Sequence, residues 1–360
     1  MSELRYGLIG CGRIALNHIA AALENKIEIV AVCDLMSEKM EHIIDKFGLE
    51  GVNKYYSYEE MIQEEKLDLV AIATESGTHA QIAINSIKLK CNVIIEKPIA
   101  LSLQDANEII MCAEENKVLV SVCHQNRFNR SIQKIREALE EGRFGTLYHG
   151  TAHVRWSRSE EYYKQAKWRG TWEQDGGALM NQCIHNIDLL RWMMGEEIVE
   201  VMAYTDNLAH DYIEAEDIGL AIIKFKNGSY GMIEGTTNVY SSNLEETLYI
   251  FGENGVAKAG GKSVNVIEEW RFKDEIYDSK SIKEIYNENP PNVYGYGHTP
   301  LYRDMKDSIK NNREPYISGE DGKRALELVL AIYKSAKEGK NIKLPLESGS
   351  SEEFKIDYNY

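Results

Sequence analysis

The sequence predicts an α/β protein in which a doubly wound parallel sheet is followed by an α+β domain with a large, open, mainly antiparallel sheet. In the first third, short apolar runs alternate with stretches of helical spacing, which is typical of parallel sheets. From Gly145 onward the apolar runs are longer and rich in β-forming residues. At 360 residues the chain is about twice the usual domain length, so two domains are expected.

The N-terminal domain is predicted to span residues 1–122. Its strands are short apolar runs bounded by turns, as expected where both faces of a parallel sheet are covered; they span 4–9, 27–33, 67–73, 93–95 and 118–122. Its helices carry apolar residues at helical spacing; they span 13–25, the segment that ends at Gly48, 80–89 and 104–115.

The second domain is predicted to span residues 123–346. Its β-rich runs are 147–156, 198–204, 218–226 and 229–238, and Asn227-Gly228 indicates a tight hairpin between the last two. Helices are expected at 179–192, 301–311 and 322–338. The run 218–226 is apolar on both faces, so we expect helices to cover one face and a second subunit the other. The polar end, 347–360, is expected to be a loose tail.

Charge and cysteine content exclude several classes of protein. The net charge of -16 argues against a nucleic-acid binder, because phosphate binding needs a basic surface. We find neither a leader sequence nor an apolar run of membrane-spanning length. The 6 cysteines are scattered without metal-ligand spacing, which predicts no metal site and a reduced, cytoplasmic, soluble protein.

A glycine-rich loop follows the first predicted strand and opens a helix. In Gly10-Cys11-Gly12-Arg13-Ile14-Ala15 the first glycine makes the turn and the second lets a pyrophosphate approach the helix N-terminus. Asp34 ends the second strand, where a carboxylate accepts hydrogen bonds from an adenosine ribose and repels a 2′-phosphate. The pattern predicts a Rossmann domain that binds NAD rather than NADP, although the nearby Lys39 leaves NADP open. The alternative is a simple glycine turn with a surface acid.

Glu96-Lys97-Pro98 comes directly after the predicted strand 93–95. Lys97 therefore lies at the carboxyl end of a parallel strand, where open α/β sheets bind ligands. Its ammonium could stabilise the negative charge that develops on a substrate oxygen during hydride transfer. The alternative, a surface Lys-Pro turn, is the usual role of such a pair.

The segment from Asp175 to Trp192 begins with two glycines and continues as a predicted helix. Asn181, His185 and Asp188 fall on one face of that helix. A histidine near neutral pKa can take the proton of an alcohol, so His185 is a candidate acid–base residue. A structural histidine is the alternative.

Arginines and tyrosines crowd the loop before this helix. Arginine suits a diphosphate or carboxylate, and tyrosine suits a sugar or uracil face, so we predict substrate binding there. A polar loop that merely covers the site is the alternative. The candidates are Arg155, Arg158, Tyr162, Tyr163 and Arg169.

The glycine loop with Asp34, the Glu-Lys-Pro turn and the Gly-Gly…His-x-x-Asp-Leu-Leu segment together resemble the Gfo/Idh/MocA oxidoreductase family. The resemblance covers nearly the whole chain and implies dimers or tetramers that pack through the C-terminal sheet. It implies that Lys97 and His185 are the catalytic pair and that the Lys97–Pro98 bond is cis. It also implies further residues near the cofactor: Glu96 and Lys97 at the nicotinamide ribose, with Thr74, His79 and Gln125 close by.

One position departs from many sugar dehydrogenases of the family. Asn181 stands where those proteins have an aspartate, so an Asp–His dyad is not available and Asn181 could instead bind a substrate hydroxyl. The sequence from Trp168 to Gln182 is similar to that of the branch of the family that oxidises the 3-hydroxyl of UDP-linked N-acetyl sugars. A free-sugar or inositol dehydrogenase remains an alternative, as does an NAD-binding sensor without turnover.

Overall fold

The computed structural model describes residues 4–195, 197–274, 276, 278–290 and 294–358, which fold into two compact units. The first unit comprises Met1–Cys123 and His298–Lys323, and the second comprises His124–Gly297 and Arg324–Tyr360. The chain therefore leaves the first unit at Cys123 and returns to it at His298. The sequence analysis expects one boundary between the two domains, at residues 122 and 123, and does not expect the chain to return to the first unit.

The first unit is built on a six-stranded parallel sheet in the order β3-β2-β1-β4-β5-β6. This order reverses direction between β1 and β4, which is the doubly wound Rossmann arrangement predicted from the sequence. The strands are β1 (Arg5–Ile9), β2 (Glu28–Cys33), β3 (Asn53–Tyr55), β4 (Leu69–Ile72), β5 (Asn92–Ile95) and β6 (Val120–Val122).

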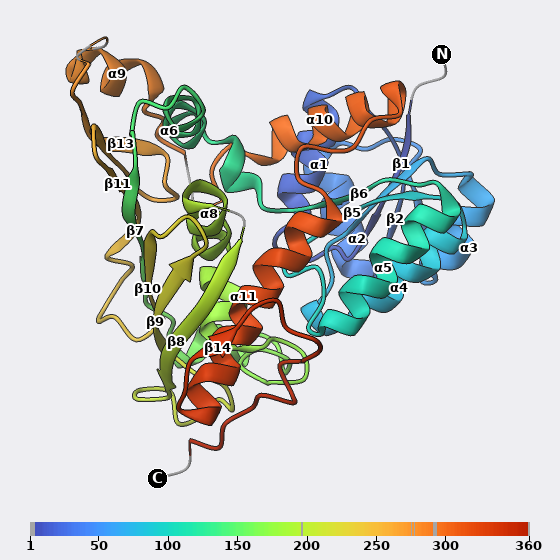
Figure 1. Ribbon diagram of the computed structural model, residues 1–360. Helices are drawn as coiled ribbons and strands as arrows, with labels where there is room; N and C mark the ends of the chain where they lie inside the picture. Colours follow the sequence, from blue (N-terminus) through green and yellow to red (C-terminus); the bar gives the residue numbers. More distant parts are fainter. Residues whose placement is uncertain (1–3, 196, 275, 277, 291–293, 359–360) are drawn as a thin grey trace. The chain divides into compact units, whose positions relative to one another are not determined.

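Helices cover this sheet, and several have clear end signals. Gly48 ends α2 with a φ of 60°, and the side chains of Ser57 and Ser102 accept backbone hydrogen bonds at the starts of α3 and α5. The helix α10 packs on α1 and belongs to the returning segment (Figure 1). The helices are α1 (Ala15–Glu24), α2 (Ser37–Phe47), α3 (Tyr58–Glu65), α4 (His79–Lys88), α5 (Leu103–Asn116) and α10 (His298–Asn311).

The second unit contains an eight-stranded sheet in the order β13-β12-β11-β7-β10-β9-β8-β14. The β7–β10 pair is parallel and the other pairs are antiparallel, which confirms the predicted mainly antiparallel sheet. Asn227-Gly228 joins β9 to β10 as predicted. The strands are β7 (Leu147–Arg155), β8 (Ile198–Asp206), β9 (Ile218–Phe225), β10 (Tyr230–Thr236), β11 (Glu245–Gly252), β12 (Gly255–Gly260), β13 (Val266–Phe272) and β14 (Ile342–Lys343).

The two faces of this sheet differ. Helix α8 (Ile184–Met194) covers one face, and it approaches so closely that a Cβ on Gly150 would lie 2.9 Å from Leu190 Cδ1. On the other face Leu220 and Ile222 are 47% and 60% exposed. Other helices of the unit are α6 (Arg130–Glu140), α7 (Glu160–Lys164) and α9 (Ser279–Tyr286), while α11 (Gly319–Glu338) spans the boundary between the units.

The C-terminal segment is ordered through residue 358, although the sequence predicts a loose tail. Phe354 and Ser351 are buried, and the Ser351 hydroxyl donates to the Trp172 carbonyl at 2.7 Å. The Tyr358 hydroxyl lies 2.7 Å from that of Thr205 on β8. Because the segment is mostly polar, its sequence does not indicate that these few side chains pack on the second unit.

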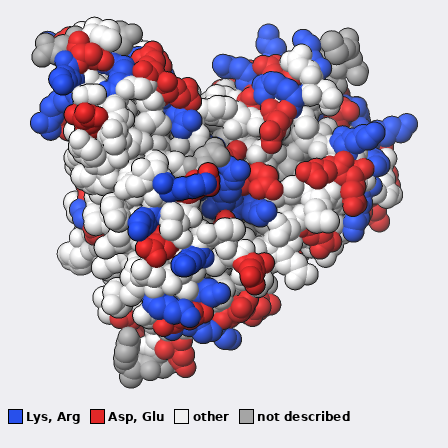
Figure 2. All heavy atoms as spheres, viewed as in Figure 1, with Lys and Arg blue, Asp and Glu red and all other residues white. Residues whose placement is uncertain are grey.

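Surface charge, helix length and the cysteines add three observations. Acidic and basic side chains are interspersed on the face shown in Figure 2. Within the described ranges, every helix is too short or too polar to cross a bilayer. The six cysteines are free of disulfides and buried.

Candidate active site

The glycine loop has the geometry that a dinucleotide requires. Gly10 has a φ of +90°, and a Cβ there would lie 2.6 Å from the Ala73 carbonyl oxygen, so only glycine fits. Nothing lies within 4 Å of the position where Gly12 would carry a Cβ. The backbone of Gly12 is therefore open to a pyrophosphate at the start of α1.

Asp34 is tied to this loop through its carboxylate. Oδ2 accepts the Cys11 N–H at 2.8 Å and Oδ1 accepts the Met36 N–H at 3.0 Å, while Lys39 Nζ lies 3.9 Å from Oδ1. A carboxylate has about four acceptor sites, so acceptor capacity remains for a ribose hydroxyl. The site of Gly10, Cys11, Gly12 and Asp34 thus fits NAD, with Arg13 and Ile14 in the turn that follows.

Lys97 lies in a turn that is held from both sides by buried groups. Glu96 Oε2 accepts the Lys97 N–H at 3.2 Å, and the Lys97–Pro98 bond is cis. His79 Nδ1 donates to the Pro98 carbonyl at 2.7 Å. Burial lowers the pKa of His79, which favours the neutral ring. Thr74, on the loop after β4, hydrogen-bonds Thr78 at 2.8 Å. These contacts fix the backbone that carries Lys97.

A buried cluster lies beneath Glu96 in the first unit. Its members, His18, Glu96, Cys123 and His298, have ligand-type atoms within 4.8 Å of one another. Burial alone would raise the pKa of Glu96, but hydrogen bonds from His18 and His298 hold it well below its usual range. His18 Nδ1 also bonds Tyr302 Oη at 2.7 Å, and burial keeps the pKa of the Cys123 thiol well above its usual range. The hydrogen bonds account for this cluster as a structural support of the Glu96–Lys97 turn.

In the second unit, the predicted helix 179–192 begins as a π-helix, Leu179–Cys183, and continues as α8. The wider π turn changes the place of Asn181 relative to the predicted α-helical spacing, whereas His185 and Asp188 both lie in α8. Asp188 is buried and pairs with Arg127 Nε and Nη2 at 2.7 and 2.6 Å. His185 remains half-buried, with its ring edge-to-face against His124 at a centroid distance of 5.8 Å.

Asn181 lies in the π-helix and is buried. Its amide donates to the Asp175 carboxylate, and its Oδ1 accepts from the amide of Gln182. The Asp175 carboxylate also accepts the Gly170 N–H at 2.7 Å. The side chain is therefore oriented by the loop that precedes the helix.

Three of the predicted substrate-binding residues are joined by hydrogen bonds, two of them to Gln182 and the third to Tyr162. Arg158 Nε and Nη2 donate to Gln182 Oε1 at 3.0 and 2.6 Å, and Gln182 Nε2 donates to Tyr162 Oη at 2.9 Å. The Arg169 guanidinium donates to the same Tyr162 oxygen and stacks 4.3 Å from the ring centroid. We call Arg158, Tyr162, Arg169 and Gln182 the arginine–tyrosine cluster. It adjoins Asn181 in the chain.

Two other predicted substrate-binding residues lie outside this cluster. Tyr163 is buried, with its hydroxyl 3.2 Å from Thr237 Oγ1. Arg155 ends β7 and pairs with Glu234 and Glu245. The buried residues of β7, such as Val154, point to the α8 face, so Arg155 points to the opposite face of the sheet.

Two family models match this chain. The NAD-binding Rossmann fold of the Gfo/Idh/MocA oxidoreductase family matches residues 4–124, and the C-terminal alpha/beta domain of that family matches residues 136–344. The chain belongs to the Gfo/Idh/MocA oxidoreductase family. The enzyme is therefore an NAD-dependent oxidoreductase, as the sequence predicted.

Solved structures similar to this oxidoreductase include two WlbA dehydrogenases in complex with NADH and UDP-GlcNAcA. The protein from Bordetella pertussis is 38% identical, with a TM-score of 0.89 and coverage of 96% of this chain and 99% of that one. The protein from Chromobacterium violaceum is 35% identical, with a TM-score of 0.87 and coverage of 96% and 97%. A myo-inositol 2-dehydrogenase of Thermotoga maritima is 28% identical over 95% of this chain and 98% of its own length.

Sequence reasoning missed two adjacent buried acids, Glu216 and Asp217, which precede β9. Glu216 Oε1 accepts the Leu179 N–H at 2.8 Å and the Tyr333 hydroxyl at 2.9 Å. A Cβ on Gly177 would lie 1.7 Å from Glu216 Oε2, so this acid fills the space above the second glycine. Burial raises the pKa of Glu216 to about 8. An acid next to a β-rich run ordinarily indicates a solvent-exposed turn, so the sequence held no signal for this role.

Gln125 and Glu246 complete the described surroundings of α8. Gln125 is buried at the start of the short helix Gln125–Phe128. Its neighbour Asn126 donates to Glu246 Oε1 at 3.2 Å. Burial raises the pKa of Glu246 to about 8, against the attraction of Arg158. Glu246 was also missed, because a buried polar residue interrupts the apolar alternation of β11.

Proposed function

We propose that this oxidoreductase transfers a hydride between NAD and the 3-hydroxyl of a UDP-linked N-acetyl sugar. The observation that carries the proposal is the arginine–tyrosine cluster. It places two guanidinium groups and a phenol ring next to Asn181, in the helical segment that also carries His185. Guanidinium groups bind diphosphates and carboxylates, and phenol rings pack on sugars or bases. The WlbA neighbours, which are complexes with NADH and UDP-GlcNAcA, support the same substrate class.

In the proposed mechanism, each residue has one task. His185 takes the proton of the sugar hydroxyl as its carbon is oxidised, and returns it in the reverse direction. The Lys97 ammonium stabilises the negative charge that develops on that oxygen. Asn181, oriented by Asp175 and Gln182, hydrogen-bonds a neighbouring substrate hydroxyl. Bound NAD, held by the glycine loop and Asp34, supplies the hydride acceptor.

The cofactor residues follow the same proposal. Gly10, Cys11, Gly12, Arg13 and Ile14 bind the pyrophosphate, and Asp34 selects NAD over NADP. Lys97 and Glu96 lie beside the nicotinamide ribose. The remaining proposed cofactor residues, Thr74, His79 and Gln125, act through the backbone around that ribose. We propose that the enzyme works as a homodimer or homotetramer in the cytoplasm, where its buried cysteines stay reduced.

A second candidate is an inositol or free-sugar dehydrogenase, which the Thermotoga maritima relative favours. An uncharged polyol has no anionic group that the two arginines of the arginine–tyrosine cluster could bind. An NAD-binding sensor is a third candidate, and the presence of both Lys97 and His185 argues against it.

A substrate panel tests these alternatives. Purified enzyme, in amounts stoichiometric with substrate so that a single turnover is visible, is mixed with NAD and UDP-GlcNAcA, UDP-GlcNAc, glucose or myo-inositol, and NADH formation is recorded. We expect NADH with a UDP-sugar and none with glucose or myo-inositol. Turnover of myo-inositol alone would replace the proposed function with the second candidate, and no NADH with any compound would favour the sensor.

A further inference from the structure

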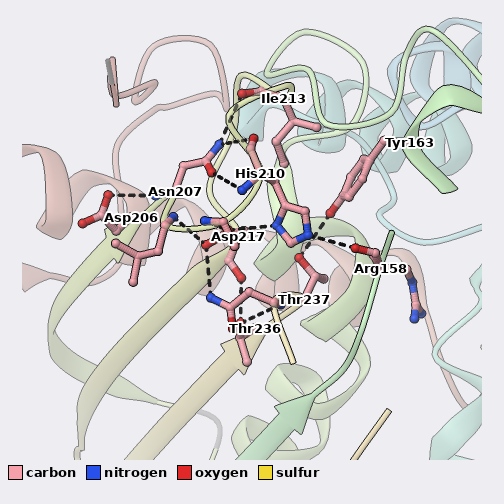
Figure 3. Close-up of polar contacts among 12 residues, drawn as sticks. Arg158, Tyr163, Asp206, Asn207, His210, Ile213, Asp217, Thr236 and Thr237 are labelled. Carbon is pink, nitrogen blue, oxygen red and sulfur yellow. Dashed lines mark hydrogen bonds and ion pairs between the residues drawn. The ribbon is translucent and has the colours of Figure 1, made fainter. Parts of the chain in front are cut away.

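Asp217 is a fully buried acid that binds four donors from two segments. Its carboxylate accepts the N–H groups of Leu208 and Ala209 at 3.1 and 2.8 Å, His210 Nδ1 at 2.8 Å and the Asn238 amide at 3.4 Å (Figure 3). Burial alone would raise the pKa of Asp217, but the hydrogen bond from His210 and the two backbone donors lower it. Asp217 is therefore an anion at neutral pH.

His210 connects this anion to the main chain of Arg158. Its Nε2 lies 2.8 Å from the Arg158 carbonyl oxygen, while its Nδ1 faces the Asp217 carboxylate (Figure 3). A carbonyl oxygen and an ionised carboxylate can only accept hydrogen bonds. His210 therefore links two acceptors, the Asp217 carboxylate and the main chain of Arg158.

The Arg158 peptide is held at its other end as well. The Arg158 N–H donates to the Thr237 carbonyl at 2.9 Å, and the Thr237 N–H donates to the Asp217 carbonyl at 2.9 Å. The main chain of Arg158 is thus anchored twice to residues that Asp217 organises. Its guanidinium remains directed at Gln182 in the arginine–tyrosine cluster.

We propose that His210 is a positioning residue that holds Arg158 ready to bind the anionic part of a nucleoside-diphosphate sugar. This inference rests on the proposed function for its ligand, and on the contacts of His210 for its geometry. Without the imidazole, the carbonyl of Arg158 loses its hydrogen bond to His210 and is released from one anchor. Substrate binding therefore weakens in that case, whereas the acid–base step on α8 is not directly affected.

The groups that face His210 hold its ring in place. They are the Asp217 carboxylate before β9, Tyr163 on α7 and Tyr212 on the loop of His210 itself, with ring centroids of both tyrosines 5.5 Å from that of His210. Burial raises the pKa of both tyrosines and thus keeps them neutral, and Asp217 stays ionised. Asp217 is therefore the charged group that orients the His210 ring.

Two substitutions of His210 separate the two hydrogen bonds. In H210N the amide reaches Asp217 but not the Arg158 carbonyl, whereas the longer amide in H210Q reaches that carbonyl. We expect H210N to raise KM for UDP-GlcNAcA roughly tenfold, with kcat and the KM for NAD within about twofold of the wild type. H210Q should recover part of this loss. H42N, which changes an exposed histidine on α2, is the matched control and should leave all constants unchanged.

The split between KM and kcat supplies a readout that a merely structural role would not move. An unchanged KM in H210N, or no recovery of KM in H210Q, would overturn the inference. So would a fall in kcat equal to the change in kcat/KM.

Hydrogen exchange at the Arg158 amide separates this inference from the proposed function, because it needs no substrate. We expect the protection of this amide to fall in H210N and to remain in H42N. Reduced protection in an enzyme that oxidises no UDP-sugar would refute the proposed function yet support the positioning of Arg158. Unchanged protection in H210N would refute the positioning whatever the substrate is.

Discussion

The Oε2 atom of Glu216 lies where a side chain on Gly177 would begin, 1.7 Å from the Cβ position. The other oxygen of the same carboxyl accepts the first N–H of the π-helix, that of Leu179. One buried acid therefore shapes the glycine turn and fixes the start of the helical segment that carries Asn181 and His185. Glu216 therefore supports the site through the backbone at Gly177 and Leu179 rather than through contact with a reactant.

The Gly177→Ala substitution should be much more damaging than an ordinary turn substitution. Gly177 has a φ of +91°, so alanine adds backbone strain to a direct overlap with Glu216. We expect a loss of roughly 3 kcal/mol or more in the free energy of unfolding, together with loss of activity. Gly142→Ala is the control, since Gly142 has a φ of +71° with nothing within 4 Å, and should cost about 1 kcal/mol in denaturant titrations. Equal losses would mean that the Glu216 overlap relaxes without cost.

Stability should fall as the pH rises toward 8, because Glu216 is held neutral in the folded protein. Its pKa is about 8 when folded and about 4.3 when unfolded, so between these values the folded state alone keeps the proton. The contribution is complete below the unfolded pKa and is lost as the pH climbs through this window. E216Q should reduce the slope of the unfolding free energy against pH by about 1.4 kcal/mol per pH unit. Glu246, whose pKa is also about 8, should leave a residual slope that E246Q removes. An unaltered slope in E216Q would show that Glu216 is already ionised in the folded enzyme.

His185→Ala should separate catalysis from cofactor binding. Removal of the imidazole eliminates the acid–base group, so we expect turnover of the UDP-sugar to fall at least roughly a hundredfold. Calorimetric affinity for NAD should remain that of the wild type. A variant that keeps its turnover would return His185 to a structural role.

Lys97→Met should likewise lower turnover by at least roughly a hundredfold, because the charge on the substrate oxygen loses its counterion in the transition state. Methionine keeps the length of the side chain, so the Glu96 and His79 contacts with the turn should survive. Thermal unfolding then serves as the control. A loss of stability in place of a loss of rate would argue against the catalytic role.

The exposed apolar face of the second-unit sheet should govern assembly. Leu220, Ile222 and Tyr204 are among its exposed residues, and apolar patches of this kind usually mark an interface. We expect light scattering to give a dimer or tetramer for the wild type and smaller species for Ile222→Glu. Met111→Glu, at an exposed position on α5 of the first unit, should leave the assembly unchanged. A wild-type monomer at micromolar concentration would refute this assignment.

Local signals explain which parts could be predicted. The glycine loop and Asp34 were predicted because strand, turn and helix follow each other within a few residues, and the hairpin at Asn227-Gly228 has a two-residue signature. The strand β11 was missed because buried Glu246 and Thr247 interrupt its apolar alternation.

Long-range contacts could not be predicted in the same way. The hydrogen bonds of Glu216 reach Leu179 and Tyr333, which are distant in sequence, and nothing in the run Glu214 to Asp217 marks two of its acids as buried. Arg155 and Arg158 look equivalent in the sequence, yet Arg155 pairs with two glutamates on the sheet whereas Arg158 joins the arginine–tyrosine cluster. Arg155 is the last residue of β7, whereas Arg158 lies beyond the end of that strand.

The return of the chain at His298 has a consequence for biosynthesis. Tyr302 on α10 supplies the buried partner for the Tyr6 hydroxyl at 2.8 Å, and His298 supplies one for Glu96. At ribosomal speeds of roughly 5–20 residues per second, these partners emerge roughly 10 to 40 seconds after Cys123. While the second unit is translated, the nascent segment that ends at Cys123 therefore lacks these two buried partners. A chain terminated at Cys123 would remain in that unfinished state, a natural substrate for chaperones and proteases.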